Sequence, residues 1–187
     1  EMDGSVYMIP ETSQVNEVSL YGFDNFPKGV RKISTLLHGA FFDTSIIKSD
    51  GLYFLLTSNN NGLHLFYSQN LDFNYVEHPQ SPITTDKKCL RNAGGIYTQG
   101  EQKFRFSQDC EYEYGKNVNL HLIEHMDEHN YVEKMLKKHL FKNTKKKCGY
   151  HHISIAKQKD ISFIAIDIKR PDSYFNKLLS LFYRYDF

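Results

Sequence analysis

The sequence contains no tryptophan, only five prolines and only three cysteines among its 187 residues. The cysteines lie far apart, at Cys89, Cys110 and Cys148. An odd number without paired spacing argues against a disulfide framework and against a zinc knuckle. We therefore expect a reducing, cytoplasmic location, and neither a metal nor a cofactor.

An excess of charge of one sign is also missing, because 23 Lys and Arg face 22 Asp and Glu. This balance gives no support to binding of nucleic acid or of an anionic membrane. No apolar run approaches the ~20 residues of a membrane span. Hydrophobic residues make up 40% of the chain, which is enough for a buried core. We expect no nucleic-acid partner, no membrane span, and a single domain over residues 1–187.

Aromatic residues are plentiful, with 13 Tyr and 14 Phe, and they favour strands and stacking against sugars or bases. Similar strand-like runs, each entered from a polar turn, recur at intervals of roughly 50 residues, close to one four-stranded propeller blade. The four runs are Gly4–Glu11, Gly51–Ser58, Gln102–Asp109 and Asp160–Asp167.

Further strand-like segments, several of them alternating polar with apolar residues, flank each run. Those expected before a run are Asp43–Lys48, Ala93–Tyr97 and His151–Ala156; those after are Glu17–Tyr21, Leu63–Ser68 and Val118–Ile123; the outer strands are Arg31–Leu37 and Asn74–His78. The pattern predicts an all-β propeller of which about three and a half blades are present, although a ring needs at least four. The chain begins with Glu1 rather than Met. We expect it to be the C-terminal portion of a larger ring.

Two segments break this pattern. Glu128–Lys147 is rich in lysine and is predicted to be a long surface connection or a short helix. In residues 168–187, Pro171 stands at a possible helix start and is followed by apolar residues at helical spacing. This end is predicted to be an amphipathic helix or a closing segment.

Six motifs in order, from about residue 3 to residue 167, resemble the N-terminal domain of plant glucosamine inositolphosphorylceramide transferases and its bacterial relatives. They are Asp3–Ser13 with Ser19–Tyr21, Asp43-Thr-Ser-Ile46, Leu65-Phe-Tyr-Ser68, His78-Pro with Ser81-Pro82, Arg91-Asn-Ala-Gly94, and Gln108-Asp-Cys with Tyr114-Gly115. That domain is similar in fold to the five-bladed propellers of glycoside hydrolase family 43. The resemblance implies a five-bladed propeller that acts on or recognises a carbohydrate.

Departures from the hydrolase pattern concern its carboxylates. The resemblance makes Asp43 similar to the hydrolase Asp that orients the acid, whereas the strand bearing the base would lie before Glu1. Where the hydrolase acid is expected, the chain reads Arg91-Asn-Ala-Gly-Gly95, without a carboxylate. The usual two-carboxylate mechanism therefore lacks its acid.

The entrances of a propeller's inner strands meet at its axis, and this places Asp43, Arg91 and His151 or His152 together, with the carboxylates of Glu11 and Asp109 nearby. We expect Glu11, Asp43 and Asp109 as candidate catalytic residues, because glycoside hydrolysis needs two carboxylates ~5–9.5 Å apart. Arg91, His151 and His152 are candidate substrate-binding residues. Each of these residues also has an alternative structural role, as a turn cap, a link between blades or one member of an ion pair.

Two other patterns are rejected as sites. His121, His125 and His129 recur every four residues like a helical metal face, but the surrounding residues alternate as a strand. The lysines between Lys134 and Lys147 favour a solvated surface over an anion-binding one.

Three functions stay open. The domain is a glycoside-hydrolase-like enzyme acting on a glycan, or a non-catalytic sugar-binding or scaffolding domain serving a neighbouring glycosyl- or formyltransferase. The third is a protein–protein platform, since a propeller fold alone does not specify function.

Overall fold

The computed structural model describes residues 4–144, 149–158 and 161–169, and these form four antiparallel sheets. The first sheet has the order β1–β2–β3, with β1 (Tyr7–Met8), β2 (Glu17–Asn25) and β3 (Lys28–His38), and a short 3-10 turn at Ser13–Val15. The second runs β4–β5–β6–β7, with β4 (Phe42–Ser49), β5 (Leu52–Asn59), β6 (Gly62–Ser68) and β7 (Val76–Glu77).

The third sheet has the order β12–β11–β10–β8, and β9 also pairs with β10. Its strands are β8 (Arg91–Asn92), β9 (Tyr97–Gln99), β10 (Gln102–Asp109), β11 (Asn117–Met126) and β12 (Tyr131–Lys137). The fourth sheet consists of β13 (Gly149–Gln158) and β14 (Ile161–Lys169). The described chain is thus all-β, as predicted.

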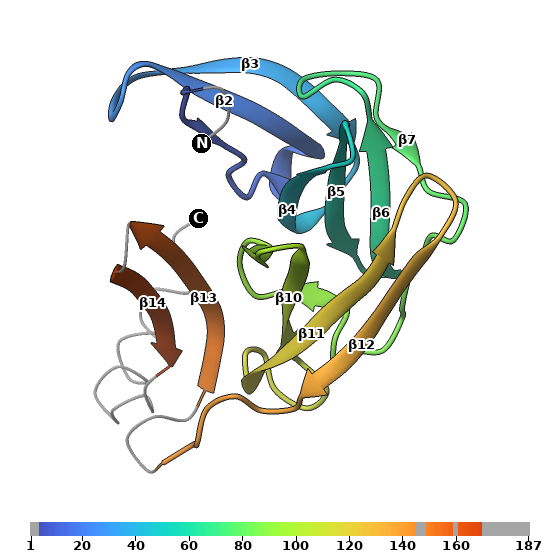
Figure 1. Ribbon diagram of the computed structural model, residues 1–187, viewed down its shortest axis with the longest axis vertical. Coiled ribbons are helices and arrows are strands. Elements are labelled where there is room, and N and C mark those ends of the chain that lie inside the picture. Colours follow the sequence, from blue (N-terminus) through green and yellow to red (C-terminus); the bar gives the residue numbers. More distant parts are fainter. Residues whose placement is uncertain (1–3, 145–148, 159–160, 170–187) are drawn as a thin grey trace, which may run out of the picture.

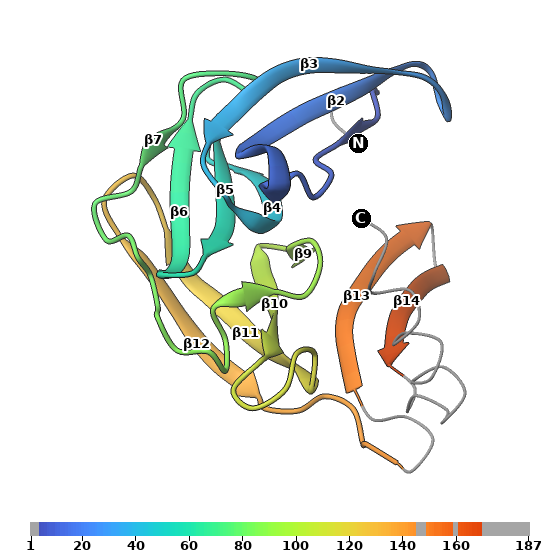
Figure 2. The ribbon, with the colours of Figure 1, turned by 180° about the vertical axis from the view of Figure 1, so that it is seen from behind.

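The sheets follow one another around a common centre in chain order, as the blades of a propeller do (Figure 1). In both views β13 lies beside the sheet that contains β10 and β11, and across the centre from β2 (Figures 1 and 2). Five blades and a single domain over residues 1–187 stay predictions.

Three hydrophobic clusters each join neighbouring sheets. Val18 and Leu20 of the first sheet pack with Leu55 of the second. Phe54, on the opposite face of β5, packs with Ile123 of the third sheet. Because alternate residues of a strand point to opposite faces, β5 is buried on both faces, which explains its nearly continuous apolar sequence.

A third cluster joins Phe106 and Val118 of the third sheet to Tyr150 and Ile153 of β13. Packing between successive faces therefore continues from the first sheet to the fourth. It places β4 next to β8, and β13 next to β10 and β11, although these strands are distant in sequence.

Two expectations about secondary structure are wrong. Within the segment Glu128–Lys147, predicted to be a connection or a short helix, Tyr131–Lys137 forms β12 and pairs with β11. The expected strand Ala93–Tyr97 is interrupted, so that β8 ends at Asn92 and β9 begins at Tyr97. In the gap, Gly94 has a φ of 120°, which is incompatible with an extended strand.

The expected C-terminal helix from Pro171 lies outside the described residues. Within the described part of the chain, no helix is long and apolar enough to cross a membrane.

Candidate functional site

A polar cavity of about 270 Å³ lies where the first, second and fourth sheets approach the loop after β8. Gly94 and Gly95 form one wall, and its polar lining comes from Glu11, Asp43, Thr44, Ser45, Asn92 and His152. Residues separated by more than 140 positions in the sequence therefore share one cavity. We call it the polar cavity.

Glu11 joins the segment after β1 to the start of β4. One carboxylate oxygen, Oε2, accepts a hydrogen bond of 3.0 Å from the backbone N–H of Asp43. The other, Oε1, accepts one of 3.2 Å from the N–H of Ser13. Both oxygens of this carboxylate thus hold backbone groups in place while the residue lines the polar cavity.

Asp43 is the second residue of β4 and has a left-handed backbone, with φ 54°. This conformation is uncommon for a residue with a side chain, and the pairing of β4 with β5 is irregular between Phe42 and Ser45. The Asp43 carboxylate accepts a 2.5 Å hydrogen bond from Nε of Arg91. Burial raises the pKa of the Asp43 carboxyl above its usual value, and the Arg91 guanidinium opposes this rise.

Arg91 binds Asp43 but is not among the described residues that line the polar cavity. Its guanidinium lies 4.3 Å from the ring centre of Phe42 and 5.0 Å from that of Tyr114. These two rings and the ion pair fix the guanidinium plane. Arg91 thus orients Asp43, and its predicted direct role in binding substrate stays a prediction.

The two neighbouring histidines of β13 have different surroundings. His152 lines the polar cavity, with Nε2 3.1 Å from the hydroxyl of Ser154. His151 pairs with Asp167 of β14 at 3.1 Å and packs against the ring of Tyr114. Their different environments follow from strand alternation, which predicted that at most one of the two would belong to a site.

Asp109 is not part of the polar cavity lining. Its carboxylate is fully buried and lies 2.7 Å from Nε2 of His139, and it also accepts a hydrogen bond from the N–H of Glu111. Burial alone would raise the pKa of Asp109, but these hydrogen bonds outweigh it and hold the pKa below its usual value. The structure therefore joins Glu11, Asp43 and Arg91, whereas Asp109 pairs elsewhere.

A buried polar network in the third sheet was not anticipated. Arg105 of β10 is fully buried and forms two parallel hydrogen bonds to Glu133 of β12, at 2.7 and 2.5 Å. Glu133 also accepts a 2.8 Å hydrogen bond from the hydroxyl of Tyr131 and lies 3.3 Å from His121. Alternation places Arg105 on the face of β10 opposite Phe104 and Phe106, which a strand with its phenylalanines inward would expose to solvent, so the sequence pattern gave no signal for this burial.

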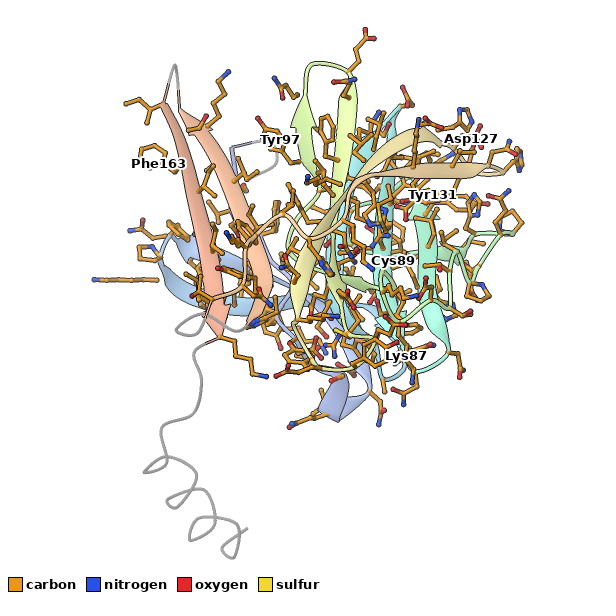
Figure 3. The ribbon with its side chains drawn as sticks, turned by 90° about the horizontal axis from the view of Figure 1, so that it is seen from below. Lys87, Cys89, Tyr97, Asp127, Tyr131 and Phe163 are labelled. Atoms are coloured by element: carbon orange, nitrogen blue, oxygen red, sulfur yellow. The ribbon has the colours of Figure 1, made fainter. Side chains whose placement is uncertain are left out.

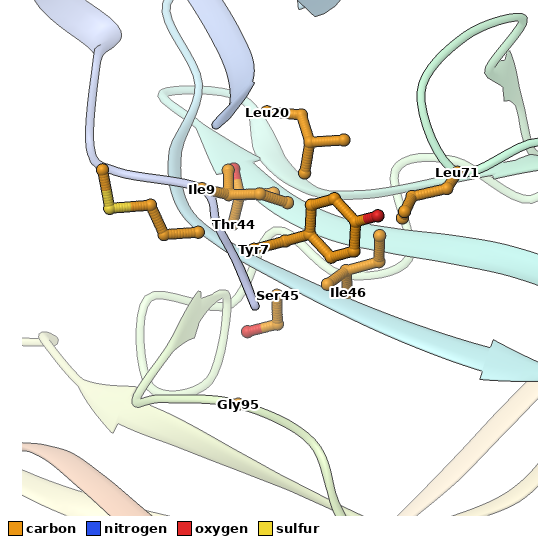
Figure 4. A pocket seen from close by; sticks show the side chains of 9 residues that line it. Tyr7, Ile9, Leu20, Thr44, Ser45, Ile46, Leu71 and Gly95 are labelled. Atoms are coloured by element: carbon orange, nitrogen blue, oxygen red, sulfur yellow. The ribbon is translucent and has the colours of Figure 1, made fainter. Parts of the chain in front are cut away.

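An apolar cavity of about 220 Å³ adjoins the polar cavity, and Ile9, Thr44, Ser45 and Gly95 line both. The residues of its own that give it apolar character are Tyr7, Met8, Leu20, Ile46 and Leu71, most of which are labelled in Figure 4. The two cavities together form a site with one polar and one apolar half.

Gly94 keeps the loop after β8 close to β13, and its replacement tests this contact. A Cβ atom there would lie 2.1 Å from the carbonyl oxygen of Ile153. The residue at this position also has a φ of 120°, which is unfavourable for any residue with a side chain. We expect Gly94→Ala to lower the free energy of unfolding by roughly 1–3 kcal/mol, measured by urea denaturation. The matched control is Gly95→Ala, because a Cβ at Gly95 meets nothing within 4 Å. Equal stability of both variants would contradict the assigned contact.

The family model for the N-terminal part of glucosamine inositolphosphorylceramide transferase 1 matches residues 1–168. Among similar curated proteins is glucosamine inositolphosphorylceramide transferase 1 of Arabidopsis thaliana, 28% identical over 141 residues, or 70% of this chain and 18% of the relative. The protein of the same name from Oryza sativa subsp. japonica is 30% identical over 141 residues, or 70% of this chain and 19% of the relative. The chain thus spans about a fifth of the length of these relatives. With the model matched over nearly all of its length, the chain belongs to the family of glucosamine inositolphosphorylceramide transferase N-terminal domains.

Proposed function

We propose that this domain is a non-catalytic recognition domain that holds a sugar-bearing substrate for a transferase. The observation that carries the proposal is the state of the carboxylates in the polar cavity. Glu11 binds two backbone N–H groups and Asp43 is paired with Arg91, so both serve as fixed hydrogen-bond acceptors.

Hydrolysis of a glycosidic bond requires different chemistry from the same residues. One carboxyl must carry a proton for the leaving group, and a second must act as base or nucleophile across the bond. Both carboxylate oxygens of Glu11 already accept backbone N–H groups, so neither is placed to deliver a proton to a leaving group. Asp109, the third carboxylate expected for this mechanism, pairs with His139 instead. These contacts support recognition over hydrolysis.

The charge of the site indicates the class of ligand. Two carboxylates line the polar cavity, whereas the guanidinium of Arg91 lies outside its lining. Such a cavity favours a ligand with hydroxyl donors and a positive charge. The names of the family and of its relatives include glucosamine, whose ammonium and hydroxyl groups fit this description. We therefore propose an amino sugar as the polar part of the ligand, with the apolar cavity receiving a neighbouring apolar group.

Binding of glucosamine by this chain, measured by NMR titration, tests the proposal against glucose, N-acetylglucosamine and inositol. We expect glucosamine to bind more tightly than the three uncharged compounds. Asp43→Asn is expected to weaken glucosamine binding about tenfold, because it removes a charged acceptor.

The control is Glu101→Gln, since Glu101 is exposed and is not part of the polar cavity lining. Equal affinity for all four compounds, or unchanged binding by Asp43→Asn, would refute amino-sugar recognition. Glycosidase turnover that disappears in Asp43→Asn would instead establish the hydrolase function.

A further inference from the structure

The backbone of Asp43 is held by side chains from two other parts of the molecule. Glu11 accepts from its N–H, and Nδ2 of Asn92 donates to its carbonyl oxygen at 2.8 Å. A left-handed backbone at a residue with a side chain costs about 1–3 kcal/mol and persists only where its surroundings fix it. The position of the Asp43 carboxylate therefore depends on these two contacts.

The Asn92 side chain is buried, and its hydrogen bonds define how its amide is oriented. Besides Asp43, Nδ2 donates to the carbonyl oxygen of Leu56 at 2.8 Å, so both amide hydrogens have acceptors. Its oxygen Oδ1 accepts from Nη1 of Arg105 at 3.3 Å. With carbonyl oxygens on one side and a guanidinium on the other, only one orientation of this amide satisfies its neighbours.

Arg105 is itself rigidly placed. Glu133 binds Nε and Nη2 in parallel, and Nη1 also donates to the carbonyl oxygen of Cys89 at 3.0 Å. Arg105 is completely buried, and it lines neither of the two cavities described above. An unbroken set of hydrogen bonds thus runs from β12 through Arg105 and Asn92 to Asp43 at the polar cavity.

We propose that Arg105 is a positioning residue for the polar cavity, because it orients the Asn92 amide that holds the strained backbone of Asp43. The inference rests on the proposed function only where ligand binding is concerned; the link to Asp43 stands apart from it. Arg105 acts here through Asn92 and does not touch the ligand.

The test uses Arg105→Lys, which keeps the positive charge beside Glu133 but removes the planar group that reaches Asn92. NMR titration of the Asp43 carboxyl is expected to show its pKa displaced by about half a unit, and glucosamine binding to weaken about fivefold. The matched control is Tyr131→Phe, which removes a hydroxyl from the same network at its far end, beside Glu133. This variant is expected to leave both the Asp43 titration and the binding unchanged.

Unchanged titration of Asp43 in Arg105→Lys overturns the proposal, as does an equal displacement in Tyr131→Phe, which would mark a general effect of the network on the fold. If Arg105→Lys does not fold, Asn92→Ser tests the link to Asp43 from its other end, and an unchanged titration there also overturns it. Absence of glucosamine binding in the wild type refutes the proposed ligand, whereas the Asp43 titration still decides the role of Arg105.

Discussion

Glu133→Ala is expected to lower the free energy of unfolding by about 3–5 kcal/mol, because it leaves the completely buried guanidinium of Arg105 without its counter-ion. Both hydrogen bonds of the pair disappear at once, and the hydroxyl of Tyr131 loses its acceptor. Urea denaturation at neutral pH measures the effect.

Two further variants test whether the loss of stability in Glu133→Ala comes from the missing counter-ion of Arg105. Glu124→Ala removes an exposed glutamate of the neighbouring strand and is expected to change the free energy of unfolding by less than about 0.5 kcal/mol. Replacing both partners, Arg105→Met with Glu133→Leu, is expected to restore most of the loss, because no buried charge then stands alone. A loss below about 1 kcal/mol in Glu133→Ala would show that water or another group compensates Arg105.

Acidification from pH 7 to pH 4 is expected to cost the fold about 3 kcal/mol through His121 alone. Burial, together with the positive charge of Arg105, lowers the pKa of His121 from 6.5 to about 4, although Glu133 opposes this. The unfolded chain therefore binds a proton at His121 that the folded chain excludes. This contribution to stability is complete above pH 6.5 and decreases as the pH falls towards 4.

His121→Gln identifies this contribution, because its stability is expected to fall less between pH 7 and pH 4 than that of the wild type. His78 is also buried, and its pKa is lowered mainly by burial, so that some acid sensitivity persists in the variant. His125→Gln is the control, since the His125 side chain is half exposed beside Asp127. Identical pH profiles of His121→Gln and the wild type would contradict the assignment.

Much of the β structure could be predicted from alternation and from turn residues. The predicted run Gln102–Asp109 coincides with β10, and β4, β5 and β6 lie within one or two residues of their predicted bounds. The lysine-rich β12 was missed because one of its inward positions is Glu133, whose partner Arg105 lies on another strand. A charged residue at an inward position hides the alternation of apolar residues that marks a strand.

The candidate site was predictable only in part, for a similar reason. The assumption that the starts of the inner strands of successive blades meet at the axis correctly predicted that Asp43 lies next to Arg91. The same assumption also put Asp109 near them, whereas in the structure Asp109 pairs with His139, which follows the unpredicted strand β12. The part of Asn92 in holding Asp43 depends on side-chain hydrogen bonds between strands, and no spacing in the sequence encodes it.

The last strand of the described chain has a practical consequence for handling the protein. Ile161, Phe163 and Ile164 of β14 are each more than half exposed. Figure 3 shows Phe163 at the left of the view, on the side of its sheet that lies away from the other sheets. Within the described part of the chain β14 pairs with β13 alone, and its other backbone edge has no partner strand there. Preparations of this chain should therefore aggregate increasingly with concentration, and dilute samples suit the measurements above.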